Sequence, residues 1–443
     1  MKGRGRGSLL LFCLFSFLFL LLGVSCEESK DSCENDNKFG GYFSTREGEW
    51  GDTEKFEEEM IKFVERQQKL LETPKRSKFI VFQPVHTGLG NRLEGMVSTF
   101  LIAYLTGRGF LVNFDHYDPK TRLPRIHMIE DEILDEPFPW QYDLLTSNVN
   151  SEYVEKNSVG IELRGGRNSF DEPFVEVLSC GDMKDYLNKQ AQYVMIKGNK
   201  YFGQLIANNP LYSEKLSQLF RPGIRRNMFA SLLGFLLRPK QKLIEEAASF
   251  ITRHKHKDEK NNYILGVQTR TTEKFADAEN LPIYNECAEL GLAEGREKER
   301  KGEGEGLVFL STDDISMRGL LHRRFGDDLI FHEDELIDMR SSAGRYRTTV
   351  WHGMKDILTL AMSDDMVVTC GSSFSRIAIG LARKPATVVS AAKKYCQQHV
   401  PLTCSKTTSI EPCCYLWYEL SMKQSSCFNS KIEFQEMAIC GNM

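Results

Sequence analysis

The chain has 443 residues, of which 41% are hydrophobic and 27% charged. It therefore exceeds one typical domain, since single cores rarely grow past roughly 250 to 300 residues, and it is too apolar for a disordered protein. Lys and Arg number 57 against 61 Asp and Glu, a formal net charge of −4. This balance predicts no nucleic acid partner, so any phosphate recognition has to be local.

The N-terminus carries a secretory-pathway pattern. Lys2, Arg4 and Arg6 precede an almost unbroken apolar run over residues 9–24. As a helix this run is about 24 Å long, short of a hydrocarbon core of roughly 30 Å. Two outcomes stay open: residues 1–26 are a cleaved signal peptide, or an uncleaved signal anchor that contacts the membrane. Both predict an oxidising lumen for the remaining chain.

Twelve cysteines are unevenly distributed, because six of them fall within the last 48 residues. These six are Cys396, Cys404, Cys413, Cys414, Cys427 and Cys440. No C-x-x-C pair occurs in the sequence, so a structural zinc site of the usual spacing is not favoured. We expect a local disulfide framework in this tail.

The first elements in chain order predict a stem and then an α/β unit. Residues 27–76 are polar, and 54–71 carry apolar residues at mostly helical spacing. A buried strand at 79–84 then leads through a glycine-containing loop to a helix over 93–106. A second strand follows at 110–114, which completes a βαβ unit of the kind that binds nucleotides.

The middle of the chain is less regular. Residues 119–209 contain Pro, Asn and Gly clusters and give no clear topology. A helical pattern covers 211–250, with interruptions at Pro222 and Pro239. Its apolar part, 229–237, is too short to cross a membrane, and we expect it to pack between two domains.

A second α/β half follows. Buried strands are predicted at 263–268, 307–310, 365–369 and 386–390. Between the first two lies the charged, glycine-punctuated tract 294–306, which we expect to be a solvated loop. The pattern predicts two α/β halves in one chain.

Arg270 follows the strand at 263–268 and is flanked by threonines. At the carboxyl end of a parallel strand, where open α/β sheets bind ligands, its guanidinium can bind phosphate oxygens. A structural ion pair is the alternative interpretation.

Asp313 and Asp314 follow the next strand. An aspartate at this point can accept hydrogen bonds from a base or ribose, or cap the helix that begins near Ile315. A magnesium site shared with substrate phosphates is a further alternative, although no third acidic ligand stands nearby in the sequence.

The third strand ends in a serine-rich loop that leads into a helix. Its residues are Ser372, Ser373, Phe374 and Ser375. Small hydroxyl residues at a helix N-terminus offer N–H and O–H donors and the positive end of the helix dipole to an anion. Simple helix capping is the alternative, but three polar strand ends in one half favour a phosphate-bearing nucleotide.

The first half contributes a glycine loop with Gly88, Gly90, Asn91 and Arg92. It lacks the third glycine of a dinucleotide fingerprint, so it is a poor dehydrogenase signal. Its glycines nevertheless allow a close approach of the backbone to a sugar or phosphate, with Asn91 as an orienting donor and acceptor.

Four stretches in order along the chain resemble the plant xyloglucan fucosyltransferase family. They are PVHTGLGNRLEGMVSTFLIAYLTGR at 84–108, NPLYSEKLSQLF at 209–220, GVQTR at 266–270 and SIEPCCY at 409–415. The segments around Arg270, Asp313 and Ser373 are also similar to the three motifs of the wider GDP-fucose transferase superfamily. The third motif, GSSFSRIAIGLA, lacks the Trp of the plant members, and the tract 294–306 is an addition.

The resemblance implies a GT-B fold, in which two Rossmann-like lobes face a central cleft. The acceptor-side lobe would cover 77–255 and the donor lobe 256–443. It implies an inverting transfer of L-fucose from GDP-fucose, α1,2 to a galactose of a glycan acceptor, without a metal ion. It also implies a Golgi enzyme of type II topology with a role in cell-wall biogenesis.

The same resemblance assigns roles to residues. Arg270 would bind the phosphate as the catalytic residue, Asp313 the guanosine, and residues 372–375 the diphosphate, while the glycine loop would complete the donor site. No base for the acceptor hydroxyl stands out; His86, Asp115 and Glu273 are candidates by position only. A protein O-fucosyltransferase and a non-catalytic glycan-binding descendant remain as alternatives.

Overall fold

The structure is a computed structural model. It describes residues 54–85, 87–113, 133–134, 140–163, 172–220, 227–255, 263–271, 281–299, 306–333, 346–389, 404–407 and 409–412. The predicted signal segment 1–26 and five of the six tail cysteines lie outside these ranges. Within them, none of the helices combines the length and apolar character needed to span a bilayer.

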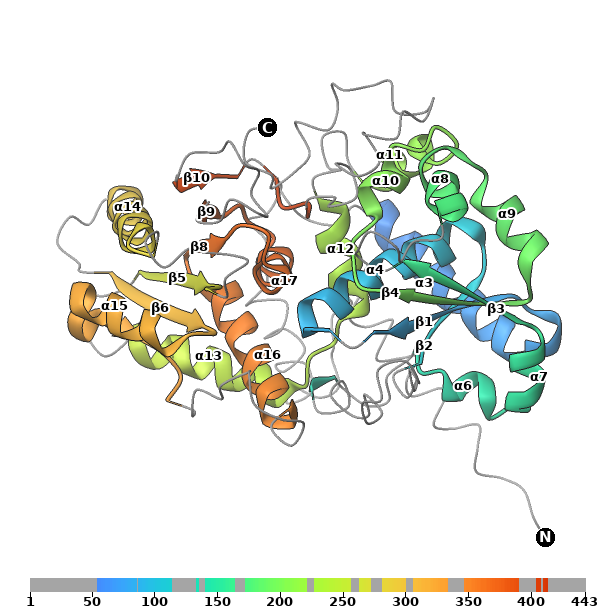
Figure 1. The fold of residues 1–443 in the computed structure, drawn as a ribbon, viewed down its shortest axis with the longest axis horizontal. Helices are drawn as coiled ribbons and strands as arrows, with labels where there is room; N and C mark the ends of the chain where they lie inside the picture. The colour runs from blue at the N-terminus through green and yellow to red at the C-terminus, as the bar shows by residue number, and fades with distance from the viewer. Residues whose placement is uncertain are drawn as a thin grey trace, which may run out of the picture.

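Two parallel sheets form the centres of two lobes (Figure 1). The first sheet has the order β2-β1-β4-β3, and all its strands are parallel. Its strands are β1 (Phe79–Pro84), β2 (Gly109–Val112), β3 (Ser158–Leu163) and β4 (Tyr193–Gly198). Strand β1 is buried along its whole length, as expected for a central strand covered on both faces.

The second sheet has the order β10-β9-β8-β5-β6-β7, in which only the edge strand β10 is antiparallel. Its strands are β5 (Ile264–Thr269), β6 (Leu307–Thr312), β7 (Leu329–Ile330), β8 (Asp365–Thr369), β9 (Thr387–Val389) and β10 (Cys404–Lys406). The four strands predicted for this half are thus confirmed as β5, β6, β8 and β9. Two Rossmann-like lobes, predicted from the sequence, are present.

The helices of the first lobe surround its sheet. They are α3 (Glu54–Glu72), α4 (Leu89–Thr106), α6 (Asp143–Thr146), α7 (Ser151–Lys156), α8 (Glu172–Cys180), α9 (Met183–Gln190), α10 (Gly203–Ala207), α11 (Ser213–Leu219) and α12 (Met228–Leu236). Helix α4 is buried on nearly all sides, because it lies between the first sheet and the second lobe. It ends at Gly107, whose φ of 73° is a left-handed C-cap conformation that suits glycine.

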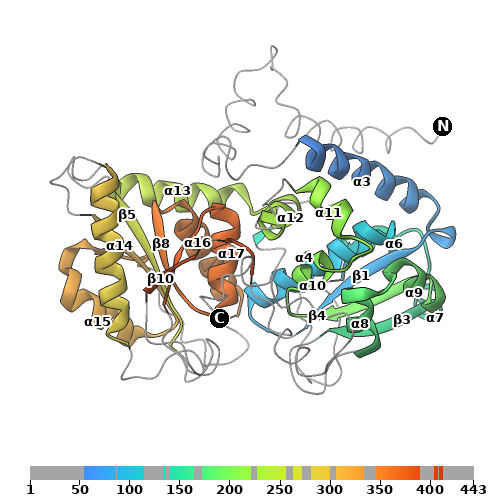
Figure 2. The same ribbon diagram turned by 90° about the horizontal axis from the view of Figure 1, so that it is seen from above.

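The second lobe is a three-layer sandwich. Its helices are α13 (Gln241–Lys255), α14 (Ile283–Glu299), α15 (Ile315–Phe325), α16 (Tyr346–Met362) and α17 (Ser373–Ala382). Figure 2 shows β5 and β8 between α14 on one side and α16 and α17 on the other. Helix α13 precedes the predicted lobe boundary at residue 255, but it packs against α16 of the second lobe.

The predicted amphipathic helix and βαβ unit near the start are confirmed. Helix α3 buries Phe56, Met60 and Phe63, and the Phe63 ring meets the Phe100 ring of α4 edge-on, with centroids 5.0 Å apart. The predicted helical region 211–250 is also present as α11, α12 and α13. Its apolar part, α12, packs between α4 and α17, so it lies between the lobes as expected.

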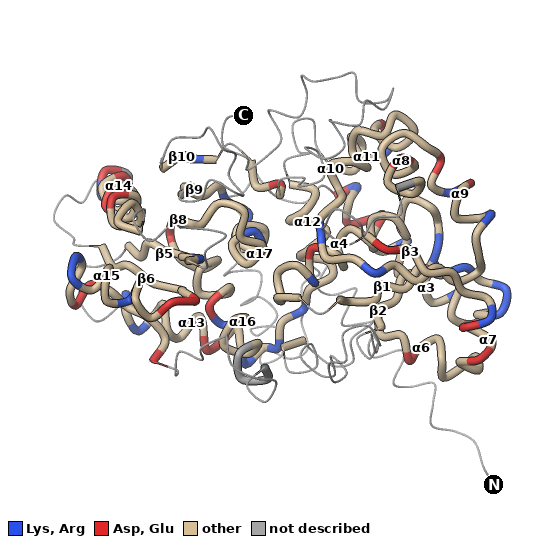
Figure 3. Tube along the Cα trace, viewed as in Figure 1, with Lys and Arg blue, Asp and Glu red and all other residues tan. Residues whose placement is uncertain are grey.

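The first part of the tract 294–306 differs from the expectation of a solvated loop, because α14 continues as far as Glu299, and residues 300–305 lie outside the described ranges. A Cβ at Gly295 would overlap the Tyr263 ring, so this glycine lets the helix lie close to the start of the sheet. Glu294 adds an ion pair to Lys406 at 2.8 Å. The charged residues of the tract up to Glu299 therefore occupy a helix, and Figure 3 shows acidic residues along α14.

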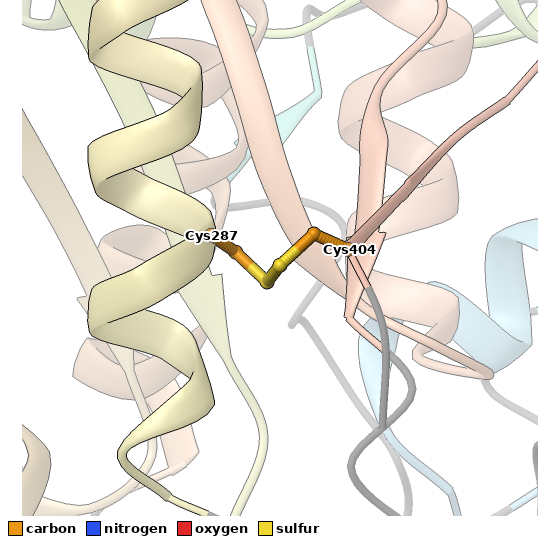
Figure 4. Close-up of a disulfide and its surroundings, with 2 residues drawn as sticks. All are labelled: Cys287 and Cys404. Atoms are coloured by element: carbon orange, nitrogen blue, oxygen red, sulfur yellow. A yellow bond between two sulfur atoms is a disulfide. The ribbon is translucent and has the colours of Figure 1, made fainter. Parts of the chain in front are cut away.

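The disulfide framework is also less local than expected. Cys404 of β10 is bonded to Cys287 of α14, 117 positions earlier (Figure 4). Because β10 pairs with β9 at the edge of the sheet, it comes to lie beside α14, which packs against β9. Cys180 and Cys370 also form disulfides. For Cys404 the expectation of a pairing within the tail was wrong.

Candidate functional site

Arg270 and Asp313 meet at the carboxyl ends of the neighbouring parallel strands β5 and β6. The Arg270 Nη1 lies 3.1 Å from the Asp313 Oδ2, and the other carboxylate oxygen accepts a hydrogen bond from the Thr271 N–H at 3.0 Å. The Asp313 side chain is only 9% exposed, whereas that of Arg270 is 33% exposed. The structural ion pair is therefore present, and the arginine is held at the surface of the strand ends.

The two aspartates after β6 have different roles. Asp314 is the N-cap of α15, because its Oδ1 accepts a hydrogen bond from the Ser316 N–H at 2.8 Å. Its Oδ2 accepts a hydrogen bond from the Thr271 hydroxyl at 3.0 Å. The capping role thus belongs to Asp314, and Asp313 positions Arg270. In the ranges that the structure describes, no cluster of three or more acidic, His or Cys side chains could hold a metal ion.

The serine loop is the N-terminus of α17, which begins at Ser373 with Ser372 as its N-cap residue. The Ser375 hydroxyl donates a hydrogen bond to the Gln268 Oε1, so this serine serves the fold itself. The first N–H groups of a helix have no intrahelical acceptor. The backbone of this turn, more than the Ser375 hydroxyl, is thus available to an anion.

A buried hydrogen-bond network connects the first and third motifs. The Thr369 hydroxyl accepts a hydrogen bond from the Arg270 N–H at 2.8 Å and lies 2.7 Å from the Tyr284 hydroxyl. Burial raises the pKa of Tyr284 well above its usual value. The Gln268 Oε1 also accepts from the Thr369 N–H at 3.4 Å. Sequence reasoning missed Tyr284 and Thr369, since their role depends on contacts about 100 residues apart along the chain.

The glycine loop of the first lobe touches the serine loop of the second. A Cβ added at Gly90 would lie 2.6 Å from the carbonyl carbon of Ser373 and 2.8 Å from the Phe374 nitrogen, both backbone atoms. At Gly88 a Cβ would have nothing within 4 Å. Asn91 donates a hydrogen bond to the Thr87 hydroxyl at 2.9 Å. Of these two glycines only Gly90 is required by the close approach of the lobes.

The N-termini of α4 and α17 therefore meet where the two lobes touch. Both helices are long enough for a full dipole, with 18 and 10 residues. Their positive ends and their first N–H groups converge near Gly90 and Ser373, and Thr369 links this corner to the Arg270 backbone. Arg92, assigned to the same loop, is 4% exposed and is thus a buried residue of α4.

A buried ion pair joins the same two helices one turn further along. Arg376 of α17 donates from Nε to Glu94 of α4, and the side chains are 6% and 1% exposed. The Arg376 Nη1 also donates to the Gly371 carbonyl at 3.2 Å. This pair fixes the register of α17 against α4, since burial of either charge alone would be costly.

Asp356 of α16 is a further candidate that sequence reasoning missed. Its Oδ2 accepts a hydrogen bond from the Ser311 hydroxyl at 2.7 Å, two residues before Asp313. Burial raises the pKa of Asp356 to about 6. One turn earlier, a Cβ at Gly353 would contact the Phe374 ring at 3.6 Å, so this part of α16 lies beside the serine loop. The helical sequence around this aspartate contains no recognisable motif, so only its position in the fold identifies it as a candidate.

The neighbour of Asp356 is a neutral histidine. His332 Nε2 lies 4.0 Å from the Asp356 Oδ1 and 2.9 Å from the Thr359 hydroxyl. Burial lowers the pKa of His332 to about 3, and Phe250 packs on its ring with centroids 4.2 Å apart. The histidine therefore adds no positive charge beside the carboxylate at neutral pH.

The three candidates for a base, His86, Asp115 and Glu273, lie outside the described residues. Their roles stay predictions. Arg270, Asp313 and residues 372–375 lie at the carboxyl ends of β5, β6 and β8, and Gly90 at the start of α4 meets this corner. Their roles in binding a donor also stay predictions.

The same overall fold occurs in a solved structure. A mutant of FUT1 from Arabidopsis thaliana in complex with GDP superposes with a TM-score of 0.60 and 16% sequence identity, covering 89% of this chain and 91% of that one. Weaker matches are NodZ α-1,6-fucosyltransferase soaked with GDP-fucose (TM-score 0.42, 13% identity, 71% and 94% covered) and POFUT1 in complex with GDP (0.39, 14%, 69% and 95%). No protein-family model and no curated protein sequence matches the chain. The fold is therefore of the two-lobed GT-B type predicted from the sequence.

Proposed function

We propose that the chain is an inverting fucosyltransferase that transfers L-fucose from GDP-fucose to a hydroxyl group of a glycan. The observation that supports this most is the meeting of two helix N-termini near Gly90 and Ser373, linked through Thr369 to Arg270. This arrangement suits a diphosphate, and the likeness to a GDP-bound fucosyltransferase structure points to the same ligand class.

The charges of the site suggest how the transfer proceeds. Breaking the bond between fucose and phosphate leaves negative charge on the GDP leaving group. Arg270, held in place by Asp313, and the N–H groups of residues 373 and 374 in the first turn of α17 would stabilise that charge as it develops. We expect no metal requirement, so that turnover should persist in the presence of EDTA.

We assign recognition of the base to Asp356 and keep Asp313 as the residue that orients Arg270. Asp313 already accepts hydrogen bonds from Arg270 and Thr271. The carboxylate of Asp356 is fixed at one oxygen by Ser311, beside the turn that carries Phe374. An ionised carboxylate can accept hydrogen bonds from the N1–H and amino group of guanine, which adenine and uracil do not offer in that pattern.

The acceptor and the compartment rest on the sequence resemblance. We propose transfer α1,2 to a terminal galactose of a cell-wall or glycoprotein glycan, in the Golgi lumen, by a protein held in type II orientation when its N-terminal segment is uncleaved. The basic residues before the apolar run 9–24 support this orientation.

The experiment is a donor screen with the lumenal part from residue 27 onward. GDP-fucose should be consumed with galactose-terminated acceptors, and Arg270→Ala should lower turnover by about 100-fold or more. Fucose found on folded polypeptide domains instead would indicate a protein O-fucosyltransferase. Binding of GDP without turnover on any acceptor would indicate a non-catalytic descendant, and unchanged turnover in Arg270→Ala would contradict the proposal.

A further inference from the structure

The chain returns from the second lobe to the first over a few residues near its C-terminus. Residues 404–407 belong to the second lobe, where Cys404 is bonded to α14 and the Thr407 N–H donates to the Ala386 carbonyl at 2.9 Å. Residues 409–412 begin two positions further on and are buried, and Glu411 and Pro412 contact the first lobe. Figure 1 shows this part of the chain running from β10 toward α12. We call residues 409–412 the interlobe strap.

Glu411 is the centre of the interlobe strap. Its Oε1 accepts a hydrogen bond from the Phe229 N–H, in the first turn of α12, and its Oε2 accepts one from the Tyr201 hydroxyl at 2.9 Å. Gln204 donates to the Pro412 carbonyl next to it. The Glu411 side chain is almost fully buried, and three groups of the first lobe hold the strap.

The strap supplies the cap that α12 lacks. Asn227, at the N-cap position of this helix, makes no side-chain capping bond. The Phe229 N–H is one of the donors that a helix cannot satisfy itself, and a buried donor left without an acceptor is costly. Glu411, 182 positions away in the sequence, provides that acceptor.

The strap contacts helix α12, which packs between the two lobes. A Cβ at Gly380 of α17 would lie 2.9 Å from the Phe229 ring and 3.0 Å from Leu233, so α12 and α17 are in close contact. Helix α17 carries the serine loop and Arg376, which is paired with Glu94. A shift of α12 would therefore move or loosen the corner formed by Gly90 and Ser373.

We propose that the interlobe strap holds the two lobes at one orientation, and that Glu411 is the positioning residue that does so through α12. These contacts lie within the chain itself, so the strap would hold the lobes whichever donor the protein uses. It contrasts with a two-lobed protein whose lobes open and close about a flexible connection.

The stability of the strap should also depend on pH, because Glu411 carries a titratable carboxyl group. Burial raises its pKa to about 8, and the groups that face it, the Phe229 N–H and the Tyr201 hydroxyl, only partly oppose this effect. In the described residues no charged side chain contributes to its pKa. The carboxyl group can accept both hydrogen bonds in either form, but ionisation above about pH 8 places a buried charge there that has no cationic partner among the described residues.

The test uses hydrogen exchange by mass spectrometry on the full lumenal chain. In Glu411→Ala, peptides over α12 and the first turn of α17 should exchange at least 10-fold faster than in the wild type, while β6 is unchanged. Glu411→Gln, which keeps one donor and one acceptor, should stay within 2-fold. If Glu411→Ala does not fold, Tyr201→Phe, which removes one of the hydrogen bonds, should give a smaller acceleration in the same peptides.

A pH series separates this role from general loss of packing. In the wild type, exchange of α12 corrected for intrinsic rates should rise between pH 7 and 9, and in Glu411→Gln it should stay flat. Equal exchange of α17 in Glu411→Ala and the wild type, or equal pH responses in the wild type and Glu411→Gln, would overturn the inference. Calorimetry of GDP binding to the wild type tests the proposed function separately.

Discussion

At the scale of single residues, the candidate site depends on a few side chains with one function each. Asp313 holds Arg270, Asp314 caps α15, and Ser375 binds Gln268 inside the fold. Adjacent residues of similar chemistry thus differ in what they offer a ligand. Mutations at this scale should accordingly give distinct effects.

Gly90 should tolerate no larger side chain. A Cβ there would lie within 3 Å of the backbone of Ser373 and Phe374, which cannot move aside as a flexible side chain could. We expect Gly90→Ala to cost about 1–3 kcal/mol of stability and to weaken GDP binding, measured by denaturant unfolding and calorimetry. Gly88→Ala is the matched control, because a Cβ at that position meets no atom within 4 Å. Equal effects of the two substitutions would contradict the assigned contact.

Asp356 should make GDP binding pH-dependent. Its folded-state pKa of about 6 lies above its ordinary value, so the carboxyl loses its charge as the pH falls through about 6. A protonated carboxyl accepts fewer hydrogen bonds from guanine, and GDP affinity measured by calorimetry should fall between pH 7 and 5. Asp356→Asn should bind weakly with little pH dependence. A wild-type affinity that stays constant over this range would exclude the assigned role.

The raised pKa of Asp356 affects the stability of the fold in the opposite direction from GDP binding: a lower pH should weaken the binding but stabilise the fold. Because the folded state holds the Asp356 proton more tightly than the unfolded chain does, this group stabilises the fold fully below about pH 4. Its contribution decreases as the pH rises from there through about 6. The Asp356→Asn substitution should remove that decrease.

At the scale of elements, α4 and α17 form the contact on which the site is built. Their buried ion pair, between Glu94 and Arg376, replaces apolar packing at the centre of the interface. Removing one charge of such a pair lowers the stability strongly, whereas replacing both charged residues with apolar ones costs much less.

The single substitution Arg376→Met should lower the free energy of unfolding by roughly 3–5 kcal/mol, because it removes the ion-pair partner of the buried Glu94 carboxylate. Combining it with Glu94→Leu should recover most of that loss, as followed by urea denaturation. If the double variant is as unstable as the single one, the ion pair has a role beyond charge compensation.

Most elements were predictable because they follow from local patterns. The strand at 79–84, the helix after the glycine loop and the strands of the second half all have clear apolar periodicity. Helix α14 was not predicted over 294–299, because charged residues and glycines there are typical of a solvated loop. The close packing of Gly295 on Tyr263 cannot be read from the sequence. Asp356 and Glu411 could not be found either, since their functions arise from partners far away in the sequence.

At the scale of the whole molecule, the end of the chain connects distant parts. The Cys287–Cys404 bond closes a segment of 117 residues that contains most of the second lobe. In the chain-entropy account, a loop of this size adds about 4–5 kcal/mol by restricting the unfolded state.

Replacing both cysteines by serine should therefore lower the denaturation midpoint of the second lobe and release the segment 404–412 to proteolysis. The double Cys287→Ser and Cys404→Ser variant, compared with the wild type in guanidinium, is the appropriate measurement. An unchanged midpoint would indicate that the pairing of β10 with β9 alone holds the tail.

The interlobe strap has a practical consequence for exchanging lobes between related proteins. A hybrid made by joining one protein's residues up to about 255 to another's remaining sequence would take its α12 from one parent and Glu411 from the other. The first turn of that helix would then face a foreign acceptor, or none. A workable module built on the first lobe is thus discontinuous, because it consists of that lobe together with four residues from near the opposite end of the chain.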